Sequence, residues 1–174
     1  MEVEAVAREA LARGSVEAAI RSTFAPSEAK ALAIDAHDGV AAVLAVRRRR
    51  DDAWIVDVVR FVDEDGVWID LGSGGGTWGD LPVDWDAATT PSLGPNVTGW
   101  SSLGDEGLVT AGGFVIGAVD AVEVVVGDRT RRVAITAGSS AFVVAVAVED
   151  DRHWEEVDVR ALDQNGAVID AMRD

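Results

Sequence analysis

Hydrophobic and polar residues alternate through the second half of the chain, and polar turns interrupt the alternation about every ten residues. These turns are Gly127-Asp128, Gly138-Ser139, Glu149-Asp150-Asp151 and Asn165-Gly166. A period of two places successive side chains on opposite faces of a strand. Short strands at this spacing are typical of an antiparallel β-sandwich, which we predict for residues 106–174. Residues 141–148 are apolar on both faces, so we expect this strand to be central.

Apolar residues near the N-terminus follow a helical spacing instead. The residues that fall on one helical face are Val3, Val6, Ala7, Ala10 and Leu11. Gly14 interrupts this stripe, a second stripe continues to Phe24, and Pro26 ends it. The pattern predicts two helices, or one kinked helix, over residues 2–24.

Four strand-like runs follow, at residues 31–36, 40–46, 54–62 and 67–71. Asp38-Gly39 and Asp65-Gly66 lie between runs, and an Asp-Gly pair in this position is a strong hairpin signal. The run at 40–46 is apolar on both faces, so we expect it to be central or covered by the helix. Residues 1–71 are therefore predicted to form a helix plus a four-stranded antiparallel meander.

Residues 72–105 show few regular signals and are predicted to connect the two halves. The run Gly72-Ser73-Gly74-Gly75-Gly76 is interpreted as a flexible turn, and three prolines follow it. Large aromatic side chains are seldom left exposed without a purpose. We therefore expect the tryptophans here to pack between the halves or to form a recognition surface, including one for carbohydrate, with the nearby aspartates. These candidate binding residues are Trp78, Trp85, Trp100, Asp80, Asp84 and Asp86.

The predicted fold class is mainly β with an α+β N-terminal unit: a helix plus a four-stranded antiparallel meander, followed by an antiparallel β-sandwich. The sandwich contains the runs Ile116-Gly117-Ala118-Val119, Arg132-Val133-Ala134-Ile135, Ala141-Phe142-Val143 and Asp163-Gln164-Asn165-Gly166. In these runs it resembles bacterial immunoglobulin-like and regulatory-like β-sandwich domains. The helix-plus-meander arrangement is similar to that of uncharacterised proteins from GC-rich bacteria. Because the matching residues are core and turn positions, the resemblance implies a fold and transfers no functional residue.

Charge and composition restrict the classes of partner. The net charge is −16 and the pI is about 4.3, so phosphate backbones repel the surface and we expect no nucleic-acid binding. A negatively charged surface favours a basic protein partner. There is no cysteine, which excludes disulfides and thiol chemistry. The acidic start and the lack of an apolar run of about 20 residues predict a cytoplasmic chain that does not enter a membrane.

Chemical motifs are sparse. His37 and His153 each lie beside aspartates in turn-like segments, and both are interpreted as exposed turn residues. No serine lies in a Gly-x-Ser-x-Gly elbow, and the histidine spacing does not suit a metal, so we expect no metal or cofactor. The glycine run lacks the lysine of a phosphate-binding loop. The four arginines 47–50 are predicted to form a charged hairpin end or a docking site for an acidic partner or phosphate.

The expected function is a non-enzymatic, acidic binding or regulatory module that engages a protein partner, as an inhibitor or immunity-like protein does. The alternative is a small enzyme or ligand binder with a pocket in the helix-and-meander unit. Trp54, His37 and Asp57 are the residues that would line such a pocket.

Overall fold

The computed structural model describes residues 3–16, 28–79, 90–136, 139–149 and 156–173. Strands make up 68% of the described residues and confirm the predicted mainly β class. The elements are α1 (Val3–Arg13), β1 (Ala29–His37), β2 (Val40–Arg48), β3 (Trp54–Glu64), β4 (Val67–Trp78), β5 (Ser92–Leu103), β6 (Glu106–Ile116), β7 (Ala121–Val126), β8 (Arg129–Ala134), β9 (Ala141–Val148), β10 (Val157–Leu162) and β11 (Val168–Arg173). Within these ranges, no helix has the length and apolar character to cross a membrane.

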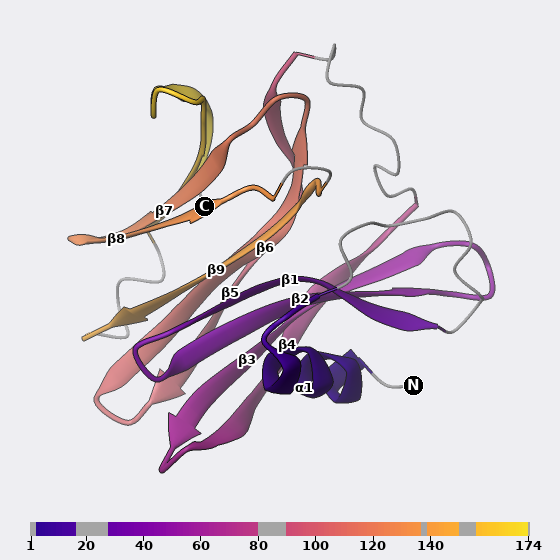
Figure 1. Cartoon of the computed structure of the whole chain (residues 1–174), viewed down its shortest axis with the longest axis vertical. Helices are drawn as coiled ribbons and strands as arrows, with labels where there is room; N and C mark the ends of the chain where they lie inside the picture. Colours follow the sequence, from indigo (N-terminus) through magenta and orange to yellow (C-terminus); the bar gives the residue numbers. More distant parts are fainter. Residues whose placement is uncertain (1–2, 17–27, 80–89, 137–138, 150–155, 174) are drawn as a thin grey trace.

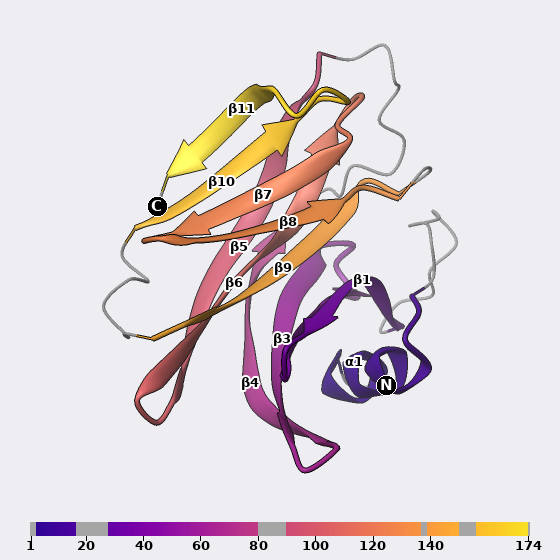
Figure 2. The same ribbon diagram turned by 60° about the vertical axis from the view of Figure 1, so that its left-hand side comes forward.

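The strands form three antiparallel sheets, which we name by their position. The N-sheet has the order β1-β2-β3-β4, the middle sheet β5-β6-β9 and the outer sheet β11-β10-β7-β8. In Figure 1, α1 and the outer sheet lie on opposite sides of the molecule, with the N-sheet and the middle sheet between them. The protein is thus built in four layers: helix, N-sheet, middle sheet and outer sheet (Figure 2). This confirms the predicted helix and four-stranded meander.

The N-sheet is covered on both faces, as the apolar run in β2 indicated. Ala41, Val43 and Ala45 pack against the buried stripe of α1. The alternate residues Leu44 and Val46 point to the other side and pack against the middle sheet. Gly14 ends α1 with a φ of 65°, a backbone conformation that glycine adopts without strain. The second predicted helical stripe falls largely on residues outside the described ranges.

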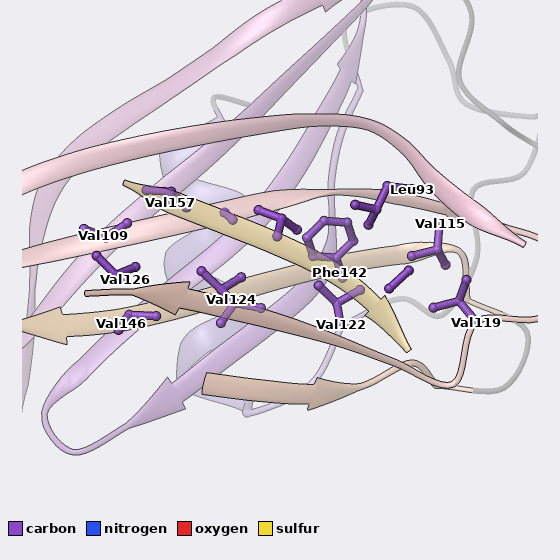
Figure 3. Packing of buried hydrophobic residues seen from close by; sticks show 14 of the residues in the cluster. Leu93, Val109, Val115, Val119, Val122, Val124, Val126, Phe142, Val146 and Val157 are labelled. Atoms are coloured by element: carbon purple, nitrogen blue, oxygen red, sulfur yellow. The ribbon is translucent and has the colours of Figure 1, made fainter. Parts of the chain in front are cut away.

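The middle sheet is buried on both faces. Val143 and Ala145 of β9 face the N-sheet, whereas Phe142, Val144 and Val146 pack in the cluster that the middle sheet shares with the outer sheet. Figure 3 shows this second cluster, in which Phe142 lies among valines of several strands. The prediction that residues 141–148 form a central strand is wrong, because β9 is an edge strand of its three-stranded sheet. Both of its faces are apolar because the sheet lies between two others.

The glycine run after residue 71 is strand, so its interpretation as a flexible turn is wrong. β4 continues through it to Trp78 and pairs with β3. Gly72, with a φ of 96°, lies where the register of this pair shifts. A Cβ at Gly75 would overlap the carbonyl oxygen of Val56, so a side chain does not fit there. Glycine in a strand marks such a close backbone approach, which periodicity does not reveal.

Much of the predicted connecting segment is also strand. β5 occupies residues 92–103 and pairs with β6, so the middle sheet begins before residue 106. Pro95 lies where this pairing shifts register, between Leu93 and Asn96. Proline is tolerated in a sheet at edge strands and bulges, and β5 is an edge strand. The proline that suggested a loop is therefore compatible with a strand.

Candidate functional site

The described tryptophans of the predicted recognition surface lie in two different layers. Trp78 packs against the cluster between the N-sheet and the middle sheet, and its ring meets Phe114 edge to face at 5.7 Å and 70°. Trp100 packs against the cluster between the middle and outer sheets. The structure therefore does not bring these two rings together. Trp85, Asp80, Asp84 and Asp86 lie outside the described residues.

Trp100 lines a surface pocket of about 310 Å³ together with Thr98, Gly99 and Val157. Its indole Nε1 is buried and makes no hydrogen bond in the described structure. The nitrogen lies over Gly107, where a Cβ would approach it to 2.9 Å. The glycine thus leaves room for the ring, and we expect packing to be the main role of Trp100.

The three residues proposed to line an enzyme pocket do not converge. Trp54 is buried in the cluster that faces the middle sheet. Asp57 points to the opposite face of the N-sheet, where burial and the charge of Glu4 on α1 raise its pKa. Both faces of this sheet are filled by apolar side chains. Within the described ranges, no group of three or more histidine, aspartate or glutamate side chains could hold a metal ion.

His37 is not an exposed turn residue, and that prediction is wrong. It is the last residue of β1, its side chain is 19% exposed, and its Nε2 donates to the carbonyl oxygen of Ala145 at 2.9 Å. Two residues earlier on the same strand, the Asp35 carboxylate accepts the N–H of Ala145 at 3.0 Å. These side chains therefore satisfy the backbone of β9 at its free edge, as a neighbouring strand would. His153 lies outside the described residues.

Arg131 of β8 completes this contact and ties in the third sheet. Its guanidinium donates to both Asp35 oxygens, at 2.6 and 3.3 Å. This hydrogen bonding raises the pKa of Arg131, so the arginine stays charged beside a carboxylate that is 4% exposed. The sequence alone does not reveal this junction, because Asp35 and Ala145 are 110 residues apart. The geometry supports a structural role: it joins one edge strand from each sheet.

A different arrangement lies at one end of the layers, where three hairpin turns present carboxylates. We name this surface the acidic end; its carboxylates are Asp38, Asp63, Glu64, Asp65, Asp105 and Glu106. The β1–β2 and β3–β4 turns are adjacent, because Asp63 N donates to Gly39 O at 2.8 Å. The β3–β4 and β5–β6 hairpins project toward the same end in both views (Figures 1 and 2). These turns contain no lysine or arginine.

The shape of these turns follows from their residues. Asp38-Gly39 and Asp65-Gly66 all have positive φ, from 47° to 83°, as a two-residue hairpin turn of type I′ requires. The Asp63 carboxylate accepts the Gly66 N–H at 2.7 Å and stabilises the β3–β4 turn. The acidic side chains therefore lie on tight hairpin turns. The sequence predicted the β1–β2 and β3–β4 turns but not the β5–β6 turn or the common location of all three.

Exposed apolar side chains lie among these carboxylates. Val67 is 59% exposed and Ile69 is 38% exposed, and both belong to β4 just after the acidic turn. Ile69 pairs with Val62, and Val67 pairs with Glu64, so all four lie on the same face of the hairpin. An apolar centre with a charged rim is typical of protein–protein interfaces.

A buried arginine lies beneath this end. Arg60 is 7% exposed, and its Nε donates to Ser101 Oγ of β5 at 2.8 Å. Burial lowers its pKa, and the charge of Asp70 opposes that effect. Gly74 and Gly99 leave space for the guanidinium, since a Cβ at either position would contact it. Arg60 thus joins the N-sheet to the middle sheet.

Comparisons with known proteins identify no relative. No family model, curated protein sequence or solved structure matches this chain.

Proposed function

We propose that this chain is a non-enzymatic binding module whose acidic end engages a basic protein partner, as an inhibitor or immunity-like protein does. The observation that carries the proposal is the apolar pair Val67 and Ile69, which is exposed on the β3–β4 hairpin beside its acidic turn and on the same face as Glu64. The apolar side chains supply area that a partner can bury, and the carboxylates supply charge complementarity. The net charge of −16 adds long-range steering toward a basic surface.

The placement of the other candidate residues supports binding over catalysis. The polar groups of the three-sheet junction are engaged in hydrogen bonds between strands. The residues suggested for an enzyme pocket point to different faces of the N-sheet. The acidic end, by contrast, presents both apolar and charged side chains to solvent.

The test begins with capture of partners from a native cell extract at low and high salt. A captured protein is then purified, and its association and dissociation rates are measured against wild type and variants. We expect Val67→Ser/Ile69→Ser to raise the dissociation rate about tenfold or more, because central interface residues act mainly on dissociation. Glu64→Gln/Asp65→Asn, at two exposed positions of the same turn, should lower the association rate and flatten its dependence on salt.

The matched control is Glu4→Gln/Glu9→Gln, which removes the same charge from exposed positions of α1. Its association rate should fall less than that of the hairpin variant. Recovery of no protein at low salt would count against the proposal. A captured protein that binds both hairpin variants and wild type equally would refute the assignment of the acidic end.

A further inference from the structure

The turn between β2 and β3 has a charge opposite to that of the acidic end. Arg47, Arg48, Arg49 and Arg50 follow one another where β2 ends. In a meander, successive turns lie at opposite ends of the sheet, so this turn is remote from the β1–β2 and β3–β4 turns. It belongs to a hairpin, as predicted, with Arg49 N donating to Ala53 O at 2.7 Å.

The arginines surround a hollow and do not all point into bulk solvent. They line an open cleft of about 480 Å³ together with Asp51 and Ile55. Pockets for small molecules have volumes of roughly 300–1,000 Å³, so the cleft is large enough for a ligand of metabolite size. Two of its lining residues, Arg47 and Ile55, are paired across β2 and β3.

The carboxylates of the turn compensate two of the four arginines. Arg48 pairs with Asp52 at 2.6 Å and Arg49 pairs with Asp51 at 3.0 Å. In the described structure, no ion pair joins Arg47 or Arg50 to a carboxylate, and Arg47 Nε is buried without a hydrogen-bond partner. The turn from 47 to 52 therefore carries a formal charge of +2 at pH 7 in a chain whose net charge is −16.

From this geometry we infer that the arginine cleft binds the phosphate group of a small molecule. Guanidinium groups match phosphate oxygens with paired hydrogen bonds. A phosphate monoester carries a charge of about −1.5 to −2 at pH 7, which balances the formal charge of +2 on residues 47–52. A single carboxylate would balance only one of these two positive charges. Ile55 is the only apolar side chain that lines the cleft among the described residues, so an extended hydrophobic peptide would find little to pack against.

Inorganic pyrophosphate is the probe, and isothermal titration calorimetry at low ionic strength is the measurement. We expect saturable binding of one pyrophosphate per chain. Arg50→Gln should weaken it about tenfold, since a hydrogen bond to a charged group contributes about 1.5–3 kcal/mol. Arg50 is exposed, so this variant keeps the fold. Asp51→Asn/Asp52→Asn releases Arg48 and Arg49 from their ion pairs and should strengthen binding severalfold.

Arg132→Gln is the matched control, because Arg132 is exposed on β8 and lies outside the cleft. The affinity of the Arg132→Gln variant for pyrophosphate should equal that of wild type. The inference is overturned if wild type shows no saturable binding, or if Arg50→Gln and Arg132→Gln bind equally well. Tighter binding of succinate than of pyrophosphate would refute the phosphate assignment. None of these outcomes depends on the acidic end, so this inference and the proposed function succeed or fail separately.

Discussion

Removal of the Asp35 carboxylate tests whether the three-sheet junction stabilises the fold. Asp35→Ala deletes the acceptor of three hydrogen bonds, two from Arg131 and one from the Ala145 N–H. The consequences differ for the two donors. Ala145 is fully buried, so its N–H is left without a partner. The Arg131 side chain is 35% exposed and can turn toward water.

The expected loss of stability follows from these exposures. A buried donor left unsatisfied costs about 1–3 kcal/mol. Removal of one member of a buried ion pair costs about 3–5 kcal/mol, because the remaining charge is uncompensated. Since Arg131 can regain water, the lower part of that range applies. We therefore expect Asp35→Ala to lower the free energy of unfolding by about 3 kcal/mol.

The measurement is urea unfolding followed by circular dichroism, with amide exchange of Ala145 as a local readout. Exchange at Ala145 should accelerate in the variant, because β9 loses a cap on its free edge. Asp52→Asn is the control: it removes an ion pair from a carboxylate that is 74% exposed, and it should cost less than about 1 kcal/mol.

A double-mutant cycle with Arg131→Gln separates the pair from its surroundings. The two substitutions act on one hydrogen-bond network, so their effects on the free energy of unfolding should not add. The effect of the double substitution should differ from the sum of the two single effects by at least about 0.5 kcal/mol. If Asp35→Ala costs no more than Asp52→Asn, or if Ala145 exchange is unchanged, the junction does not stabilise the fold and the reasoning is wrong.

Two further predictions concern the N-sheet. Gly75→Ala should destabilise the protein severely or prevent folding, because its Cβ would overlap Val56 O, whereas Gly79→Ala, with open space around it, should unfold like wild type in urea. The pKa of Asp57 is raised by burial and by Glu4, so its ionisation opposes folding and stability falls as pH rises above about 3.8. Asp57→Asn should therefore stabilise the protein at neutral pH, and unfolding curves measured at decreasing pH should show this advantage shrinking; a gain that persists unchanged below that pH would contradict the cause.

Local pattern determined much of the secondary structure. The helical stripe predicted α1, the period-two runs predicted most strands, and Asp38-Gly39 and Asp65-Gly66 marked two hairpin turns. Burial on both faces was also visible in the apolar runs of β2 and β9. These features can be inferred because a side chain's face depends only on the backbone period and its near neighbours.

Tertiary structure decided which of these elements meet. The glycine run forms a strand because β3 pairs with it. The segment around Pro95 forms a strand because β6 pairs with it. The pairing of Asp35 with Ala145 and the grouping of three acidic turns depend on segments distant in sequence. Alternation reports that a face is buried but not which sheet covers it, because many partners bury apolar area equally well. The three-sheet junction and the acidic end therefore emerged only when the layers were assembled, whereas the arginine run was visible in the sequence.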